Sequence, residues 1–381
     1  MNIILNGQTL QYPLTGIGWY TWYLLQGLQT HPLINQLICI PSIKLDNKRS
    51  KLAHNFLQSN FKKIIKSLPG SYIALNNCRN RLFRKRSQLL RDRNFIYHEP
   101  AYIIRPYAGS TVCTVHDLSH IYYPECHPKE RVKFLLRYLP QSIEKVDHII
   151  AVSEFTRAEV INTFNISPAK ITRIYHGISK LYRPRQFDEI KAVLCRLGLL
   201  GKNYLLSVGT LEPRKNLERL ILAFKQLSEQ QRNRHPLVLV GVKGWNHSRL
   251  EQLIKPLLQK KQLHYLGYVS ELDLAYLYSG AFAFVYLSIY EGFGLPLLEA
   301  MASGVPILTA NGSSLLEVVE NAALLVNPFD IDAIVAKLCQ LLGNEELRVR
   351  LKQRGLIQAE KFSWKVCIEN IINVYRKLAS A

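Results

Sequence analysis

Short apolar runs alternate with amphipathic segments along the whole chain. Apolar runs of this length, bounded by turn residues, are typical of buried strands, and the amphipathic segments between them are typical of helices. We predict strands at Ile3–Asn6, Leu37–Ile40, Phe95–His98, Thr111–Val115, His148–Val152 and Ile171–Tyr175 in the first half, and at Tyr204–Val208, Leu237–Val240, His264–Leu266, Phe282–Leu287, Ile307–Thr309 and Ala323–Val326 in the second. Alternation of this kind predicts an α/β fold with parallel, doubly wound sheets covered by helices on both faces.

The length of the chain predicts more than one domain. A single hydrophobic core seldom serves 381 residues. We place the boundary near His176–Arg185, so that residues 1–180 form an N-terminal domain and residues 181–358 a C-terminal one, followed by an amphipathic helix over 359–381. Open α/β sheets bind ligands at the carboxyl ends of their strands, so we expect these ends to meet at a shared cleft.

Composition excludes several classes of protein. An apolar content of 48% fits a folded globular chain. No apolar run is long enough to span a bilayer, and the first residues carry no basic leader, so we expect a cytoplasmic protein. The seven cysteines are scattered and odd in number without a Cys-x-x-Cys pair, which favours neither a zinc site nor a disulfide framework.

The net charge of +21 is concentrated in one region. The segment Lys44–Arg93 holds 14 Lys or Arg residues against Asp46 and Asp92, and apolar residues lie among the cations. Such a segment suits the anionic surface of a membrane, to which the protein would bind peripherally. A solvated basic face is the alternative, and we expect no nucleic acid.

The stretch Tyr290–Ala300 combines acidic residues with a turn and a helix start. Glu291 and Glu299 bracket a glycine turn, and Pro296 suits the first position of a helix. The positive end of a helix dipole favours an anion such as a phosphate, and carboxylates accept hydrogen bonds from hydroxyl groups. The stretch therefore predicts a nucleotide-sugar site, with an ordinary strand–turn–helix and solvated glutamates as the alternative.

Two cations follow the strand Tyr204–Val208. Arg214 and Lys215 come after a turn closed by Pro213, where they can stabilise the negative charge of a diphosphate. No Asp-x-Asp motif for Mg²⁺ stands in a comparable place. We therefore expect no obligatory metal and no cofactor, and surface residues that begin a helix are the alternative.

Further candidates lie in the first half of the chain. His116 and Asp117 end the strand Thr111–Val115, where active-site residues sit in parallel sheets. Gly16 and Gly18 form a Gly-x-Gly that permits close approach of the backbone to a phosphate or an acceptor. A satisfied histidine at a strand end and a plain turn are the respective alternatives.

Together these motifs identify a resemblance. The Glu-x7-Glu of Glu291 and Glu299 resembles the signature of retaining GT-B glycosyltransferases of the GT4 family, the mannosyltransferase-like glycosyl transferases group 1. The other stretches that carry the resemblance occur in the expected order and are Gly16–Tyr20, Val115–Leu118, Val152–Thr156, Ser207–Asn216, Gly267–Val269 and Ser313–Val318.

The resemblance implies a fold and a reaction. It implies two facing Rossmann-like domains with a cleft between them, and a C-terminal helix that crosses back onto the N-terminal domain. It also implies transfer of a mannose- or glucose-type hexose from a nucleoside diphosphate sugar to a glycan or lipid-linked acceptor, with retention, in the synthesis of cell-surface polysaccharide such as O-antigen. Attack would come from the face on which the diphosphate departs, with a phosphate oxygen taking the acceptor proton.

The resemblance also implies roles for single residues. Glu299 would bind the ribose hydroxyls, Glu291 would contact the donor sugar, and His116 would lie next to the reacting sugar. Arg214 and Lys215 would stabilise the leaving diphosphate. The remaining roles fall on backbone or acceptor contacts: Phe293, Gly294 and Leu295 for sugar hydroxyls or phosphate, Tyr268 and Val269 for the base, Gly16 and Gly18 for a loop over the diphosphate, and Asp117 for His116 or the acceptor.

Three other functions remain open at this point. The same architecture serves nucleotide-sugar epimerases and phosphorylases that carry a lysine-bound pyridoxal group. A non-catalytic scaffold that binds membrane or nucleic acid through Lys44–Arg93 is the third. Saturable binding of a nucleoside diphosphate separates a transferase from such a scaffold.

Overall fold

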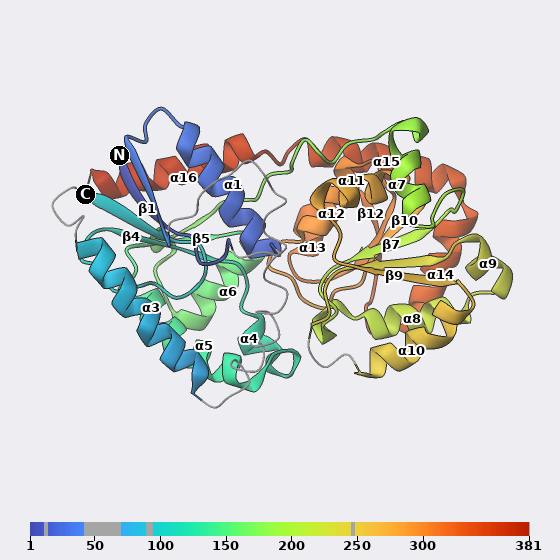
Figure 1. Ribbon diagram of the computed structural model, residues 1–381, viewed down its shortest axis with the longest axis horizontal. Coiled ribbons are helices and arrows are strands. Elements are labelled where there is room, and N and C mark those ends of the chain that lie inside the picture. The colour runs from blue at the N-terminus through green and yellow to red at the C-terminus, as the bar shows by residue number, and fades with distance from the viewer. Residues whose placement is uncertain (11–13, 42–69, 89–93, 245–247, 381) are drawn as a thin grey trace. The chain divides into compact units, whose positions relative to one another are not determined.

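The structure is a computed structural model that describes residues 1–10, 14–41, 70–88, 94–244 and 248–380. The chain forms two compact units. One comprises Met1–His176 together with Trp364–Ala381, and the other comprises Gly177–Ser363. Each unit contains a parallel sheet with helices on both of its faces (Figure 1).

The N-terminal unit has a sheet of the order β2-β1-β3-β4-β5-β6. Its strands are β1 (Asn2–Asn6), β2 (Gln36–Ile40), β3 (Phe95–Glu99), β4 (Thr111–Val115), β5 (His148–Ala151) and β6 (Ile171–Arg173). Its helices are α1 (Gly16–Thr30), α3 (Ser71–Gln88), α4 (Ser119–Tyr122), α5 (Lys129–Lys145), α6 (Glu154–Phe164) and α16 (Trp364–Ala379). Every residue of β3 and β4 is buried, which is what helices on both faces of a parallel sheet require.

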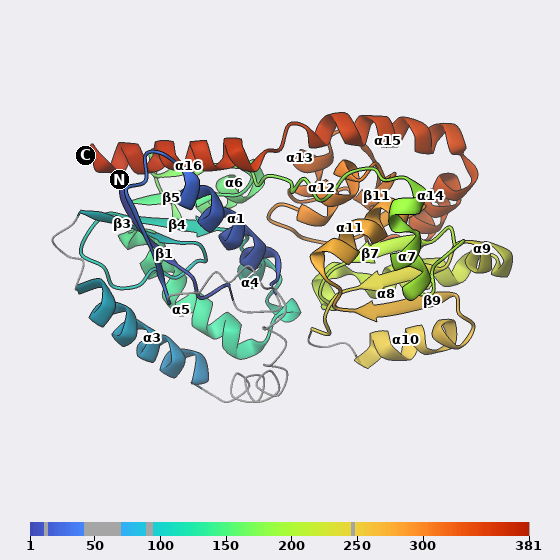
Figure 2. The ribbon, with the colours of Figure 1, turned by 45° about the horizontal axis from the view of Figure 1, so that its top comes forward.

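The last helix of the chain completes the core of this unit. Figure 2 shows α16 in red beside α1 in blue, and the two helices pack against each other. Ile371 and Tyr375 of α16 are fully buried with Leu24 of α1 and Ile3 of β1 in one hydrophobic cluster. The N-terminal sheet therefore owes part of its cover to residues from the far end of the sequence.

The C-terminal unit has a sheet of the order β12-β11-β10-β7-β8-β9. Its strands are β7 (Leu205–Val208), β8 (Leu237–Val240), β9 (Leu263–Gly267), β10 (Ala283–Tyr286), β11 (Ile307–Ala310) and β12 (Ala323–Val326). Its helices are α7 (Phe187–Arg196), α8 (Leu217–Gln226), α9 (Glu229–Arg234), α10 (Ser248–Gln259), α11 (Glu271–Gly280), α12 (Leu295–Ala302), α13 (Leu315–Val319), α14 (Ile331–Gly343) and α15 (Glu345–Ala359).

The strand order identifies where each sheet should bind a ligand. In the C-terminal unit the chain builds β7, β8 and β9 outward in one direction and then returns to place β10 on the other side of β7. In the N-terminal unit the corresponding reversal lies between β1 and β3. Open α/β sheets bind ligands outside the carboxyl ends of the strands at such a reversal.

Three local predictions are wrong. Gly16 and Gly18 lie in the first turn of α1 and not in a loop. A Cβ atom at position 18 would come within 2.9 Å of the carbonyl oxygen of Thr9, so the glycine serves close packing of the helix against the preceding segment. The sequence pattern also predicts a helix over Lys129–Leu139 that ends before Pro140. Helix α5 instead runs on to Lys145, because Ile143 beyond the proline is buried in the core.

The third of these predictions is a capping box, because Ser314 and Glu317 have the spacing of that motif at the start of a helix. The Ser314 hydroxyl makes no capping bond to α13. It donates instead to the carbonyl oxygens of Glu291 and Phe293, at 2.8 and 3.1 Å. Ser314 thus holds the turn that precedes α12, although it lies in the chain after that helix.

Only part of the basic segment Lys44–Arg93 is described. Residues 44–69 and 89–93 lie outside the described residues, and α3 represents the segment in the structure. Phe83 of α3 is buried, while its basic residues Arg81, Arg84, Lys85 and Arg86 are exposed. Over the described part of the chain, we find no helix with the length and apolar character needed to cross a membrane.

Candidate active site

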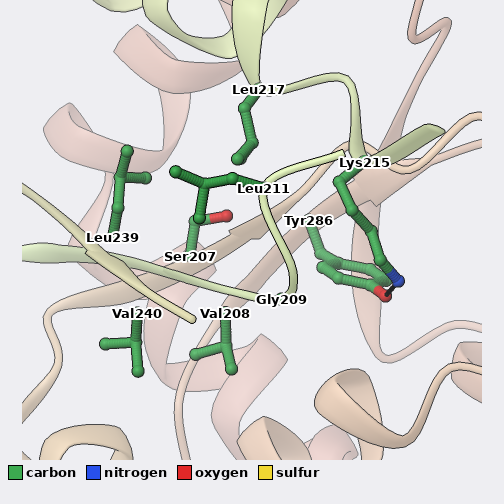
Figure 3. A pocket seen from close by; sticks show the side chains of 9 residues that line it. All are labelled: Ser207, Val208, Gly209, Leu211, Lys215, Leu217, Leu239, Val240 and Tyr286. Atoms are coloured by element: carbon green, nitrogen blue, oxygen red, sulfur yellow. Dashed lines mark hydrogen bonds between the residues drawn. The ribbon is translucent and has the colours of Figure 1, made fainter. Parts of the chain in front are cut away.

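A pocket opens at the strand reversal of the C-terminal sheet (Figure 3). Its walls come from the carboxyl ends of β7, β8 and β10 and from the segment that follows β7. The lining residues are Ser207, Val208, Gly209, Leu211, Lys215, Leu217, Leu239, Val240 and Tyr286. The location is the one that the strand order predicts for a ligand.

The segment after β7 carries both predicted cations. Pro213, Arg214 and Lys215 form one short 3-10 helix directly before α8. The carbonyl oxygen of Arg214 accepts hydrogen bonds from the backbone N–H of Ile289 and from the hydroxyl of Ser288, at 3.0 and 3.1 Å. These bonds tie the segment after β7 to the segment after β10, which carries Glu291.

Four charged side chains alternate in sign beside the pocket. Arg214 lies between Glu212 and Glu291, with Nη2 2.7 Å from Glu212 Oε1 and Nη1 2.8 Å from Glu291 Oε2. Lys215 Nζ lies 2.5 Å from Glu291 Oε1. All four side chains are only 7–12% exposed, so solvent screens these ion pairs little. Glu212 lies within the Ser207–Asn216 stretch, two positions before Arg214, but the sequence pattern predicts no role for it.

Two hydroxyl groups add to the bonds of Glu291. Tyr286 and Ser288 donate to Glu291 Oε1 at 2.8 and 2.5 Å. Burial alone would raise the pKa of Glu291, but Arg214 and Lys215 outweigh it, and the pKa falls to about 2. Glu291 is therefore an ionised acceptor whose oxygens already bind two cations and two hydroxyls. That arrangement suits an anchor for the cations better than a free nucleophile.

Tyr286 and Ser288 were not predicted. Tyr286 ends β10 and Ser288 follows it by two residues, and the directions of these side chains decide whether they reach Glu291. A polar-tipped side chain in an otherwise apolar run was the available signal.

Glu299 occupies a different environment from Glu291. It lies on α12 beside the phenols of Tyr278 and Tyr182, with no cation among the causes of its shift. Burial raises the pKa of Glu299 to about 8, against the effect of the two phenols, and the charge of Glu271 adds to the rise. Near neutral pH this carboxyl is mostly protonated and can both donate and accept hydrogen bonds.

Two serines that follow β11, Ser313 and Ser314, hold the turn between Glu291 and Glu299 through hydrogen bonds to its backbone. Ser313 Oγ accepts from the backbone N–H of Glu291 at 3.1 Å, and the Ser314 hydroxyl binds the carbonyl oxygens on either side of Gly292. Gly294 has a φ of 109°, which only glycine adopts without strain, and caps the start of α12. The helix begins at Leu295, so Pro296 takes its second position and not the first as predicted. The backbone of Phe293, Gly294 and Leu295 thus forms the entry to α12.

Tyr268 and Val269 follow β9, the outer strand of this sheet on the far side of β8. Tyr268 is 38% exposed. Both residues lie at the carboxyl edge of the sheet from which the pocket opens.

The remaining candidates belong to the N-terminal unit. His116 follows β4, and its Nε2 lies 2.8 Å from the carbonyl oxygen of Pro100. Because a carbonyl only accepts, Nε2 carries the proton. Burial lowers the pKa of His116 to about 4, against the opposing effects of that bond and of Asp117, so the ring is neutral. Asp117 Oδ1 accepts from the backbone N–H and the hydroxyl of Ser119 at the start of α4.

Helix α1 brings its first turns to His116. The ring of Tyr20 meets the imidazole edge-on, with ring centroids 5.0 Å apart. Gly16 and Gly18 lie less than two turns before Tyr20 on the same helix. The structure therefore gathers Gly16, Gly18 and His116 in one unit, and Arg214, Lys215 and Glu291 in the other.

A metal centre is not evident in this geometry. Within the described ranges, no group of three or more His, Cys, Asp or Glu side chains is arranged to hold a metal ion.

Comparison with known proteins decides the family. Residues 197–357 match the family model of glycosyl transferases group 1, and residues 15–180 match that of glycosyltransferase family 4. The chain is 38% identical to the O-antigen chain mannosyltransferase B of Escherichia coli over 99% of its own length and 100% of that protein. The protein is a family 4 glycosyltransferase. It is also 33% identical to the O-antigen chain mannosyltransferase RfbU of Salmonella typhimurium, over 59% of each chain.

Solved structures confirm the fold of this glycosyltransferase. A sucrose-phosphate synthase from Thermosynechococcus elongatus matches with a TM-score of 0.74 and 20% identity, over 100% of this chain and 99% of that one. HepE from Anabaena, solved in complex with UDP-glucose, matches with a TM-score of 0.72 and 16% identity, over 99% and 100%. The prediction of two Rossmann-like α/β domains of the GT-B type is confirmed.

Proposed function

We propose that this glycosyltransferase moves a mannose-type hexose from a nucleoside diphosphate sugar to a growing glycan or lipid-linked acceptor in polysaccharide synthesis. The observation that carries the proposal is the buried array of Arg214, Lys215 and Glu291 beside a pocket at the strand reversal. The names of the O-antigen mannosyltransferases that it resembles support mannose and a polysaccharide product.

The proposed donor site lies in the C-terminal unit. The diphosphate meets the cationic side chains and the N–H groups of Phe293, Gly294 and Leu295, where the positive end of α12 favours an anion. Glu299 binds the ribose hydroxyls, and its mostly protonated carboxyl can exchange hydrogen bonds with both. Tyr268 and Val269 take the base. The side chains and helix N–H groups supply the charge stabilisation, so the proposal requires no metal or cofactor.

The proposed acceptor site lies in the N-terminal unit. His116 contacts the reacting sugar through a neutral ring, Asp117 contributes near the acceptor, and Gly16 and Gly18 allow α1 to approach the substrates. Retention follows from attack on the face from which the diphosphate departs, with a phosphate oxygen accepting the proton of the acceptor hydroxyl. The protein then mainly positions substrates and stabilises charge.

The test is transfer of radiolabelled hexose from GDP-mannose, UDP-glucose and ADP-glucose to a lipid-linked glycan acceptor. We expect the wild type to use one donor, and Lys215→Ala and Glu299→Ala each to lower kcat/KM by about 10²-fold or more, as loss of one preorganised charge or hydrogen bond does. Lys337→Ala on α14, which removes an exposed hydrogen bond to Gln340, is the control and should match the wild type. Near-normal turnover in both site variants would refute the assignments, and sugar release without acceptor would favour a hydrolase or epimerase.

A peripheral contact with an anionic membrane is part of the proposal. The exposed face of α3 presents Leu82, which is 56% exposed, among Arg81, Arg84, Lys85 and Arg86. An apolar side chain among cations fits the boundary of anionic lipids, at about 1 kcal/mol per basic residue near the surface. We expect flotation with phosphatidylglycerol vesicles but not with phosphatidylcholine vesicles, and loss of most binding in Arg81→Glu/Arg84→Glu. Equal flotation with both lipids would exclude this contact.

A further inference from the structure

Arg214 and Lys215 differ in how many of their donors are already engaged. Arg214 Nη1 binds the carbonyl oxygen of Tyr290 at 2.6 Å as well as Glu291, and Nη2 binds Glu212. Arg214 is not among the residues that line the pocket, whereas Lys215 is. Both terminal nitrogens of the guanidinium are therefore already bonded to the segments after β7 and β10, whereas the ammonium also lines the pocket.

The Lys215 ammonium is fixed by two partners. Its Nζ donates to Tyr286 Oη at 2.8 Å and to Glu291 Oε1 at 2.5 Å. The Tyr286 hydroxyl in turn donates to Glu291 Oε1 at 2.8 Å, so the three groups form a closed triangle. An ammonium group has three N–H donors, and two of them account for these bonds.

Tyr286 also forms part of the pocket wall. Figure 3 shows the lysine nitrogen beside the phenol oxygen at the edge of the pocket, with the dashed line between them. The ammonium lies 5.2 Å from the centroid of the Tyr286 ring, within the range of a cation–π interaction. A flexible side chain of four carbons is thereby restricted to one position without losing its third donor.

The geometry points to Tyr286 as a positioning residue that holds Lys215 so that its third N–H meets a phosphate of the nucleoside diphosphate. This inference rests on the proposed function. Tyr286 itself need not touch the nucleotide, and its hydroxyl acts through Lys215 and Glu291. Glu291 would keep its bonds to Arg214, Tyr286 and Ser288 if the ammonium moved toward a phosphate, so the carboxylate would not be left unpaired.

A Tyr286→Phe variant isolates the hydroxyl because the ring remains. Tyr204→Phe is the matched control, since the Tyr204 hydroxyl is also buried and donates to a backbone carbonyl, that of Leu277. Tyr204 precedes β7, at the end of the sheet opposite the pocket. Both variants lose the hydrogen bond that the hydroxyl donates, to Glu291 or to Leu277, but only Tyr286→Phe also loses the bond that the hydroxyl accepts from Lys215.

The experiment is isothermal titration of GDP and UDP into wild type, Tyr286→Phe, Tyr204→Phe, Lys215→Ala and the Tyr286→Phe/Lys215→Ala double variant. The corresponding monophosphates are titrated as well, and thermal melts check that each variant is folded. We expect Tyr286→Phe to weaken diphosphate binding about tenfold, the order expected for one hydrogen bond to a charged group. Binding of the monophosphate should change less, and Tyr204→Phe should bind as the wild type does.

The double variant decides the mechanism. If Tyr286 acts through Lys215, Tyr286→Phe should cause no further loss of affinity once Lys215 is alanine. The coupling energy between the two positions then equals the full effect of Tyr286→Phe on its own. Wild-type affinity in Tyr286→Phe, or equal losses in the presence and absence of Lys215, would overturn the inference. A wild type that binds neither diphosphate would instead refute the proposed function.

Discussion

The carboxyl ends of the two sheets each carry a buried polar cluster, and one cluster is built of ion pairs whereas the other is built mainly of neutral groups. At the β7/β10 reversal, Glu291 is paired with two cations, and its pKa falls to about 2. At the β1/β3 reversal, Glu99 accepts from neutral groups, namely Asn6 Nδ2 at 2.5 Å, the Tyr97 hydroxyl at 2.6 Å and the backbone N–H of Ala101 at 3.1 Å. Burial raises the pKa of Glu99 to about 7, although Arg105 and these donors act in the opposite direction.

Burial also favours the neutral form of two histidines in the N-terminal unit, His98 and His116. Burial lowers the pKa of His98 to about 3, and His116 adds to the effect. Its ring nitrogens bind the hydroxyls of Tyr375 and Thr114, at 2.5 and 2.8 Å, so a neutral ring is satisfied without any ion. Equivalent places in two related sheets thus differ because one contains cations within 3 Å of its carboxylate and the other does not. A charged cluster suits a diphosphate, and a neutral cluster suits an acceptor rich in hydroxyl groups.

The largest expected difference between the two clusters is the loss of unfolding free energy when the glutamate of each is replaced by glutamine. Glu291→Gln removes the carboxylate shared by Arg214 and Lys215, and uncompensated buried cations cost about 3–5 kcal/mol of the free energy of unfolding. Glu99→Gln replaces a carboxyl that is already about half protonated near pH 7, so we expect a change of about 1 kcal/mol or less. Urea unfolding at neutral pH measures both differences.

Tyr265→Phe, which removes a half-buried hydroxyl bond to Gly241, is a control for loss of an ordinary polar contact. Equal destabilisation by the two glutamine variants would show that the cations do not distinguish the clusters. The comparison would also fail if Glu99→Gln were the more damaging of the two.

The fold was largely predictable because helices on both faces turn each strand into an apolar run. Thr111–Val115, Leu237–Val240 and Ala323–Val326 have the predicted bounds. The family resemblance implies a loop at Gly16 and Gly18, and glycine also weakens a helix, but both residues lie in α1, where Gly18 packs against Thr9 and Leu14. Local propensity was overridden there by contacts that the sequence does not display.

The candidate site was predictable only in part. Arg214, Lys215 and Glu291 each follow a predicted strand, and parallel strands bring such residues to one edge of a sheet. Their roles stay predictions. The contribution of Tyr286 and Ser288 depends on side-chain directions, and the protonated state of Glu299 depends on burial among phenols, neither of which a linear pattern contains.

The pH dependence of stability sharpens the comparison further. The pKa of Glu99 is raised from 4.5 to about 7, so its contribution to stability is fully present below about pH 4.5 and is lost as the pH rises through 7. The loss amounts to about 3 kcal/mol, since one unit of pKa corresponds to about 1.4 kcal/mol. The pKa of Glu291 is lowered from 4.5 to about 2, so its contribution is present above about pH 4.5 and is lost as the pH falls toward 2. Glu99 therefore contributes most stability at acidic pH, and Glu291 contributes its stability above about pH 4.5.

Glu99→Gln removes the pH dependence of stability that comes from Glu99 and leaves the one that comes from Glu291. Unfolding free energies of wild type and Glu99→Gln, measured at about pH 5 and about pH 8, should differ in their pH dependence by about 2–3 kcal/mol, with the wild type losing more stability on the alkaline side. The raised pKa of Glu299 acts in the same direction in both proteins and cancels in the difference. Below about pH 4.5 the two proteins should lose stability in parallel, because Glu291 keeps its cations in both. Identical pH profiles on the alkaline side would mean that Glu99 is ionised near neutral pH, and that Arg105 is then close enough to act as its counter-ion.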